Sequence, residues 1–460
     1  MIITYVSSKV FNLTPLGTNY ELNFENYFSF TFTIAQTIGL GLAIMYPNIL
    51  TLKSKVVWPL VIYASIFAVT TILVTIQVEG NVLFGVTLLS TLLCGLCGAT
   101  LSAGLFGLGA LLPPSYTGNL MTGQALAGLL VSLSSLLTTL ASHDDTCVIV
   151  DDVVEYYGGK TECKHKISYS ALFYFIIATF VLISCIQCFL VMFRLKFTQY
   201  YILRAEESKT KNGKIDNLND PLLLDEEISS LHLSTSKDHI INAMHNSELN
   251  GRKKIDSLNT LLVNDISISR MGEDSETFSE TLWRVFKMIK IPAFSVFYVF
   301  VVSISIFPSL FVRVLSERQC TGQGRFYNDL FVPFLFVLFN LMDFTGRIVA
   351  NNFKCYFSAQ NIWIPSVMRT AFIPLMLLCN LSSSQLEVVF PSDFFPIFFM
   401  ILFGFSNGYC ASYSMMYGPS IVSTSDQSLA GTIMIFSLTM GLFFGASFSF
   451  LITYVSTGTF

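Results

Sequence analysis

Charged side chains are scarce along this chain. Asp, Glu, Lys and Arg together make up 12% of its 460 residues, about half of the roughly 25% found in soluble domains. The formal net charge is -4, so the chain lacks the basic field that binding to DNA or RNA requires. Scarce charge and 53% hydrophobic residues exclude an ordinary soluble enzyme and predict that lipid surrounds much of the chain.

Motifs for catalysis and for cofactor binding are missing as well. There is no phosphate-binding P-loop, which argues against ATP as an energy source. An intramembrane enzyme is a weak alternative, because the sequence has no His cluster, no serine nucleophile with a base and no pair of catalytic carboxylates. Cys185 and Cys188 form a CxxC, but they lie within an apolar segment and have no nearby His, so they indicate small apolar side chains. We expect no enzymatic activity, no cofactor and no metal.

Apolar segments long enough to cross a bilayer dominate the sequence. About 20 apolar residues in a helix span the ~30 Å hydrocarbon core, and ten such segments are present. Their limits are 27–50, 57–78, 82–112, 118–141, 167–193, 291–312, 330–353, 362–380, 394–417 and 427–455. The sequence therefore predicts an all-α polytopic membrane protein.

Small residues recur every four positions in several of these segments. Such a ridge lets two helix backbones approach each other closely, both in a static bundle and in one that moves. The ridges are Ser437, Gly441, Gly445 and Ser449; Gly404, Gly408 and Ser412; and Ala99, Ala103 and Gly107.

Residues 194–290 differ from the rest of the chain because they are rich in Ser, Asn, Lys and Glu. Such a composition cannot bury a core, so we predict a cytoplasmic, largely disordered loop. The loop separates an external segment (1–26) and an N-terminal lobe (27–193) from a C-terminal lobe (291–460). With five spans in each lobe, this layout is common in transporters built from two repeats.

Lys and Arg are concentrated on the side of the predicted membrane that carries the long loop, which predicts that this side is cytoplasmic. Arg313, Arg318 and Arg325 lie on the opposite side and go against the rule. The same parity places the first 26 residues outside, although they contain no signal-peptide core. We therefore expect a further span to precede them.

Two covalent modifications are candidates on the predicted external side. Asn12 begins the glycosylation sequon Asn12-Leu13-Thr14. Cys147 and Cys163 lie in one external loop, where an oxidising environment permits a disulfide between them.

Three formal charges lie within the ten segments: Asp343, Arg347 and Arg369. Charges at membrane depth cost several kcal/mol unless they are paired or face water, so each is a functional candidate. Arg347 follows Asp343 by four positions. Asn340 and Phe336 precede Asp343 on the same helical face. This stripe suits a hydroxylated ligand with a flat aromatic part; the alternative is that Asp343 and Arg347 only neutralise each other and lock neighbouring helices.

Arg369 stands about a turn and a half inside the predicted cytoplasmic end of its segment. We expect it to extend its charge to the membrane surface or to anchor the helix there.

Three stretches in this order resemble the equilibrative nucleoside transporter family. They are GLFGLGALLPPSYTGNLMTGQALAG at 104–128, FNLMDFTGR at 339–347, and SNGYCAS at 406–412 followed by AGTIMIF from Ala430. The resemblance extends from about Asn26 to Tyr454 and excludes the long loop. It implies a two-lobed bundle like that of major-facilitator proteins, with eleven spans in the family and the first of them missing here. It also implies facilitative, alternating-access transport of nucleosides, with nucleobases as a further class of substrate.

The resemblance also implies roles for the stripe of polar residues. Asp343 and Arg347 match the pair that grips the ribose hydroxyls, and Asn340 and Phe336 line the same cavity. The site expected from the residues alone and the site implied by the family therefore coincide.

Three further positions come from the resemblance only. Phe307 and Leu442 match residues that line the cavity. Ser102 stands where many relatives have a glutamine that hydrogen-bonds the base. Because a serine hydroxyl is too short to span the same gap, the resemblance implies a different base preference or affinity.

Alternatives remain for the mode of action. Asp343 is an ionisable group within the membrane, so a proton-coupled transporter is one alternative, and a truncated, non-transporting protein of the same fold is another. We expect nucleosides and lipid as partners, a monomer, and no nucleic acid polymer. The segment 220–224, DPLLL, resembles an endosomal sorting signal, but we expect the plasma membrane rather than an endosomal membrane.

Overall fold

The structure is a computed structural model that describes most of the chain. The described residues are 18–47, 49–75, 80–141, 147–150, 153–156, 169–217, 277–319, 324–353, 357–382 and 384–457. The glycosylation candidate Asn12, and Cys163 of the disulfide candidate, lie outside them, and the side chain of Cys147 is likewise not described.

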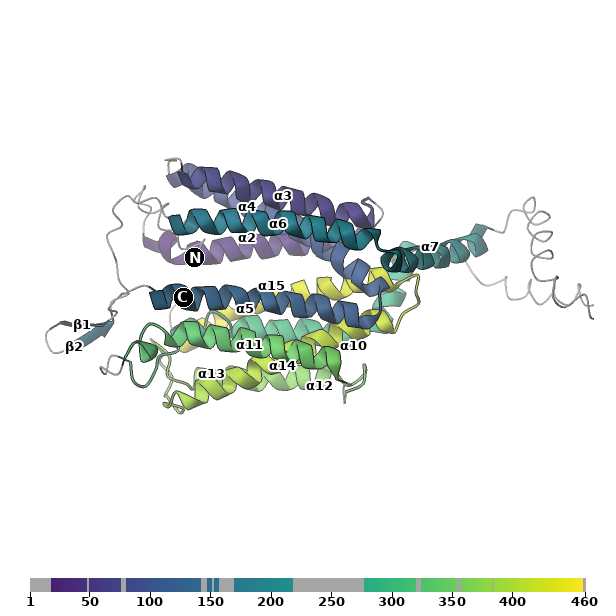
Figure 1. Cartoon of the computed structure of the whole chain (residues 1–460). Coiled ribbons are helices and arrows are strands. Elements are labelled where there is room, and N and C mark those ends of the chain that lie inside the picture. The colour runs from purple at the N-terminus through teal and green to yellow at the C-terminus, as the bar shows by residue number, and fades with distance from the viewer. Residues whose placement is uncertain are drawn as a thin grey trace, which may run out of the picture. The chain divides into compact units, whose positions relative to one another are not determined.

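Helices make up nearly all of the described chain (Figure 1). Before the long loop they are α2 (Thr18–Met45), α3 (Leu52–Thr75), α4 (Gly80–Leu111), α5 (Pro114–Ala141) and α6 (Tyr169–Arg194). After it they are α10 (Phe278–Ile306), α11 (Phe331–Asn352), α12 (Trp363–Met368), α13 (Phe372–Leu377), α14 (Phe394–Ser420) and α15 (Gln427–Thr457). Short 3₁₀ turns are η1 (Phe311–Arg313), η2 (Arg325–Tyr327) and η3 (Arg369–Ala371).

One small antiparallel hairpin departs from the predicted all-helical fold. Its strands are β1 (Cys147–Val150) and β2 (Val153–Tyr156), with Cys147 opposite Tyr156. It lies in the connection between α5 and α6, outside the apolar segments, so the main body of the protein is helical as predicted.

Each of the ten predicted apolar segments coincides with helical structure. Within the described residues, seven helices are long and apolar enough to cross a membrane, and a bent pair that includes α6 raises the number to eight. Two further apolar helical stretches, Phe30–Met45 and Trp363–Leu377, are shorter. The prediction of a polytopic helical membrane protein is confirmed, while ten spans in two lobes stay a prediction.

The long loop begins and ends in helix, which its composition did not predict. Helix α7 (Lys196–Asn217) occupies its start, and α10 begins before its expected end. Residues 218–276 lie outside the described part. The chain divides into two compact units, one made of 1–201 and 285–460 and the other of Ile202–Arg284. The boundaries of the predicted loop and lobes stay a prediction.

Glycines bring α11 and α14 into direct backbone contact. At Gly408 of α14, a Cβ atom would overlap the backbone carbonyl of Asp343, and at Gly404 it would lie 2.7 Å from the carbonyl oxygen of Phe339. Gly441 on α15 meets the carbonyl of Phe297 on α10 in the same way. Two of the predicted ridges of small residues are therefore confirmed as helix-packing surfaces.

Helix α11 also packs along α5, although the two are separated in sequence by the long loop (Figure 1). The pair is antiparallel, because Asn351 Nδ2 donates to Asn119 Oδ1 (2.6 Å) at one end, while Gly128 faces Asn340 further along. Four of the residues predicted to bind a ligand are on α11, namely Phe336, Asn340, Asp343 and Arg347, so α5 and α14 form their immediate surroundings.

The arginines that go against the predicted sidedness have structural partners. Arg313 donates to the carbonyl oxygen of Ser382 and to the hydroxyl of Ser456, each at 2.7 Å. The guanidinium of Arg318 lies over the ring of Tyr327, 5.3 Å from its centroid. Such contacts explain why arginine occurs here whichever side of the membrane these segments occupy.

Candidate functional site

The centre of the site is an ion pair within one helix. Asp343 and Arg347 are four residues apart on α11, and Arg347 Nε lies 2.9 Å from Asp343 Oδ2. Residues at this spacing face each other on a helix. Both side chains are only 6% exposed, so the pair lies inside the bundle and not at its lipid-facing surface.

The sequence of α11 explains this burial. Its core-facing residues recur at four-residue spacing as Phe331, Leu335, Phe339, Asp343 and Arg347, all of which are buried. The ion pair thus continues an apolar stripe that packs into the bundle. Charges placed there cost stability unless other groups also bond to them.

Neighbouring helices supply those groups. Asn407 Nδ2 on α14 donates to Asp343 Oδ1 at 2.6 Å, so each carboxylate oxygen accepts one bond from the protein. Arg347 Nη1 donates to the backbone oxygen of Met121 on α5 at 2.9 Å. The pair therefore joins α11 to both α5 and α14, as the alternative of a helix lock requires.

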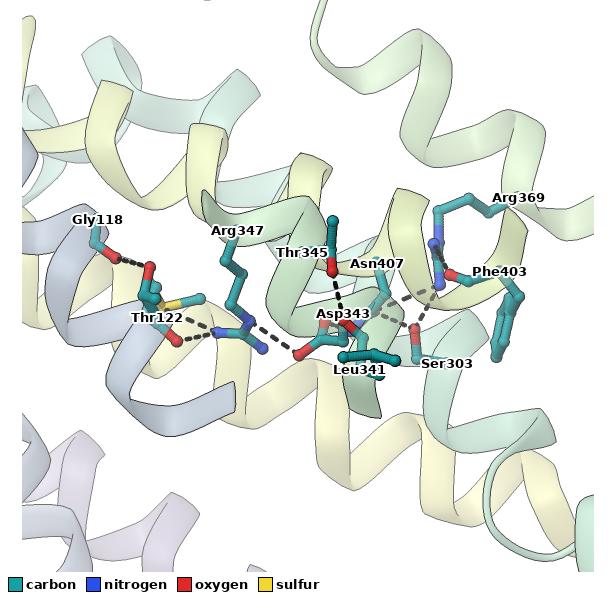
Figure 2. A network of polar contacts seen from close by, with 11 residues as sticks. Gly118, Thr122, Ser303, Leu341, Asp343, Thr345, Arg347, Arg369, Phe403 and Asn407 are labelled. Atoms are coloured by element: carbon teal, nitrogen blue, oxygen red, sulfur yellow. Dashed lines mark hydrogen bonds and ion pairs between the residues drawn. The ribbon is translucent and has the colours of Figure 1, made fainter. Parts of the chain in front are cut away.

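A second arginine reaches the same cluster through Asn407 (Figure 2). Arg369 Nη2 donates to Ser303 Oγ at 2.8 Å and to Asn407 Oδ1 at 3.4 Å. Ser303 Oγ lies 2.6 Å from the same amide oxygen. Asp343, Asn407 and Arg369 thus form one continuous polar network across α11, α14 and η3.

The expectation that Arg369 reaches the membrane surface is wrong. Its residue exposure is 2%, and its guanidinium lies 4.7 Å from the centroid of the Phe403 ring. Nη1 also donates to the carbonyl oxygen of Phe403 at 2.9 Å and to the hydroxyl of Ser406. Because α14 presents a backbone carbonyl, a hydroxyl and an aromatic face at this depth, the charge is held inside the bundle.

The charges of this network do not cancel. It contains two guanidinium groups and one carboxylate, and Arg369 Nε is buried without a hydrogen-bond partner among the described residues. Acceptor oxygens and the ring of Phe403 surround the guanidinium of Arg369 and stabilise its positive charge. The surroundings of Asp343 are therefore rich in hydrogen-bond donors.

Two other predicted residues on α11 lie next to the network. Asn340 Nδ2 donates to the carbonyl oxygen of Phe336 at 2.9 Å, and its Oδ1 faces Gly128 of α5. The Phe336 ring centroid lies 4.7 Å from that of Phe307, which in turn stacks on Phe339 at 4.3 Å. The structure thus brings Phe307 and Phe336 together as an aromatic group close to the polar stripe.

Ser102 and Leu442 lie on different helices, α4 and α15, and both are half-buried. Helices α4 and α15 pack against each other. One turn before Ser102, a Cβ atom at Gly98 would lie 2.8 Å from the Tyr63 hydroxyl, so this face of α4 is directed toward α3. The hydrogen bonds found in the described residues do not connect Ser102 to Asp343 or Arg347.

Comparison with known proteins gives the family. A sequence profile described as nucleoside transporter matches residues 88–454. Equilibrative nucleoside transporter 1 of Homo sapiens is 33% identical over 405 residues, covering 86% of this chain and 75% of that protein. Equilibrative nucleoside transporter 2 of Homo sapiens is 28% identical, covering 84% and 75%. This chain belongs to the equilibrative nucleoside transporter family.

The family match spans the whole candidate site. Equilibrative nucleoside transporter 3 of Rattus norvegicus, at 23% identity, covers 92% of this chain and 77% of its own length. Every member of the polar network, from Met121 to Asn407, falls within the matched residues. The relatives are transporters rather than enzymes, and this member of the family is a multi-pass membrane protein.

Sequence reasoning missed the two side chains, Asn407 and Ser303, that connect Asp343 to Arg369. Asn407 belongs to the stretch SNGYCAS that carried the resemblance, yet it was not predicted as a site residue. An amide side chain within α14, a helix without charged residues, was an available signal. Ser303 gave none, because serines that bond to their own helix are common within membrane helices, and Ser303 Oγ also lies 2.7 Å from the Val299 carbonyl oxygen.

Proposed function

We propose that this chain carries nucleosides across a membrane by facilitative, alternating-access transport, with nucleobases as secondary substrates. The supporting observation is the carboxylate of Asp343. It is buried on α11, and each of its oxygens accepts one hydrogen bond, from Arg347 and from Asn407. The match to nucleoside transporters supports the class of substrate.

Counting acceptor sites shows why such a carboxylate suits ribose. The two oxygens of an ionised carboxylate offer about four lone-pair positions. The protein uses one on each oxygen, so about two remain for a ligand. A 2',3'-diol supplies two O–H donors on adjacent carbons and is complementary to this arrangement.

The aromatic group formed by Phe307 and Phe336 suits the other part of a nucleoside. Aromatic rings stack on flat partners in offset or edge-to-face geometry. With Asn340 on the same face of α11, the stripe would contact both the base and the sugar. As a separate part of the proposal, Ser102 on α4 and Leu442 on α15 contact the base.

The alternating-access part of the proposal rests on contacts between helices on either side of the long loop. Helix α5 packs on α11, and α4 packs on α15. If the two groups of helices form lobes that rock against each other, these are the surfaces that separate. A monomer in the plasma membrane is sufficient for this function.

Uptake by reconstituted protein tests the proposal. Purified full-length chain in liposomes should take up labelled uridine and adenosine, and unlabelled nucleoside trapped inside should accelerate that uptake by exchange. Protein-free liposomes from the same lipid are the control. Uptake no faster than in those liposomes would reject transport and favour the non-transporting alternative.

A proton gradient separates the two modes of transport. In the facilitative mode, an inward proton gradient leaves the equilibrium level of uridine inside the liposomes equal to that outside. The proton-coupled alternative, which Asp343 motivates, requires accumulation above the outside concentration. An uncoupler that collapses the gradient should then abolish the accumulation.

A further inference from the structure

Asn407 lies between the carboxylate of Asp343, which we predict to bind the ligand, and the guanidinium of Arg369, which does not contact that carboxylate. Its Nδ2 donates to Asp343 Oδ1 at 2.6 Å, and its Oδ1 lies 3.4 Å from Arg369 Nη2. All three residues are at most 5% exposed. Water is therefore a poor substitute for any of these bonds.

The chemistry of its two partners fixes the orientation of the amide. A guanidinium only donates hydrogen bonds, so it must meet the oxygen of Asn407. An ionised carboxylate only accepts, so it must meet the NH₂ group. The reverse orientation would place donor against donor at Arg369 and acceptor against acceptor at Asp343. Ser303 Oγ, 2.6 Å from the amide oxygen, can donate to it in this orientation (Figure 2).

An amide held in one orientation holds the carboxylate as well. Asp343 Oδ1 is tied to Asn407 and Oδ2 to Arg347, so rotation of the carboxylate about its terminal bond breaks both interactions. The remaining acceptor positions then point in constant directions. A ligand with two hydroxyl groups meets a preorganised partner and loses less binding energy to ordering it.

We propose that Asn407 and Arg369 are positioning residues that set the orientation of the Asp343 carboxylate toward the sugar hydroxyls of the substrate. This inference rests on the proposed nucleoside transport and adds residues on α14 and η3 to its recognition of the sugar. Arg369 acts through Asn407, because its own hydrogen bonds go to Ser303, Asn407, Ser406 and the Phe403 carbonyl.

A double-mutant cycle with two ligands tests the positioning role. Binding of uridine and of 2',3'-dideoxyuridine to detergent-purified full-length protein is measured by isothermal titration for wild type, N407A, D343N and D343N/N407A. We expect N407A to weaken uridine binding about five- to tenfold and dideoxyuridine binding by less than about twofold. In the D343N background, N407A should change neither affinity, because the carboxylate that it positions is gone.

Matched variants separate positioning from simple loss of packing. S366A removes another buried hydroxyl of the same bundle, which lies 2.6 Å from Ser295 Oγ and outside the network; it should leave the ratio of the two affinities unchanged. S303A keeps Asn407 and Arg369 and removes one partner of the amide oxygen. It should weaken uridine binding selectively, by about two- to threefold, and remains informative if N407A does not fold.

Two outcomes overturn the inference in distinguishable ways. If D343N weakens uridine selectively but N407A and S303A weaken both ligands equally, Asn407 is structural and only the positioning role fails. If wild type does not bind uridine, or D343N does not discriminate between the ligands, the proposed sugar recognition fails and the positioning role with it.

Discussion

Arg325 donates a 2.8 Å hydrogen bond from Nη2 to the backbone oxygen of Thr139, in the last turn of α5. Its Nη1 donates to the carbonyl oxygen of Leu140 at 3.1 Å, and Asp329 Oδ2 lies 2.6 Å from Nη2. The last carbonyls of a helix have no partner within the helix. Arg325 therefore caps α5 from the segment that leads into α11 and ties the two helices together at this end.

Replacing Arg325 should loosen that end of the α5–α11 pair. We expect R325A to reduce stability by about 1 kcal/mol, since its bonds are charge-assisted but its side chain is 36% exposed. R325K should recover only part of the loss, because an ammonium cannot reproduce the planar fork of donors. Thermal unfolding in detergent measures both variants, and equal melting temperatures for R325A and wild type would contradict the cap.

Changing either member of the central ion pair should impair transport. D343N removes the charge that Arg347 Nε contacts, and R347K removes the second donor that reaches the Met121 carbonyl. We expect each to lower uridine uptake at least about tenfold at matched surface expression. Wild-type uptake by both variants would show that the pair is only a helix lock.

Removing the sugar hydroxyls from the substrate should have a parallel effect. A 2',3'-dideoxynucleoside leaves the free acceptor positions of Asp343 unpaired, at a cost of about 1–3 kcal/mol per lost bond. We expect such compounds to compete poorly with labelled uridine for uptake. Competition as strong as that of unlabelled uridine would contradict recognition of the ribose by Asp343.

Lengthening Ser102 should alter base preference. The described residues show no bond from its hydroxyl back to the preceding turn, so the hydroxyl is not committed to its own helix. S102Q adds a donor and an acceptor, and we expect a several-fold change in the ratio of adenosine to uridine affinity. S102A is the control and should keep that ratio. A uniform loss for both nucleosides would remove Ser102 from the site.

Adding one methyl group at Gly408 should disrupt the bundle at the site. The Cβ atom of G408A would overlap the Asp343 carbonyl and push α11 away from α14, so we expect a loss of more than about 2 kcal/mol. Gly123 on α5 is the matched control, since a Cβ there meets no atom of the described residues within 4 Å. Melting temperature and uridine uptake should fall for G408A and stay near wild type for G123A.

Much of this protein could be predicted from local sequence. Each apolar segment specifies a helix because its own backbone bonds are satisfied within it. The spacing of Asp343 and Arg347 places them on one helical face whatever the rest of the fold does. Both predictions concern residues within one element, where geometry follows directly from position in the chain.

The partners of that face depended on tertiary structure. Asn407 bonds to Asp343 from 64 residues away, and no spacing rule relates two positions on different helices. Arg369 shows the same limit more sharply, because the sequence suggested a charge near the membrane surface. Its burial is decided by the oxygens that α14 presents around it, and only the packing of α14 against its neighbours brings those oxygens to the guanidinium.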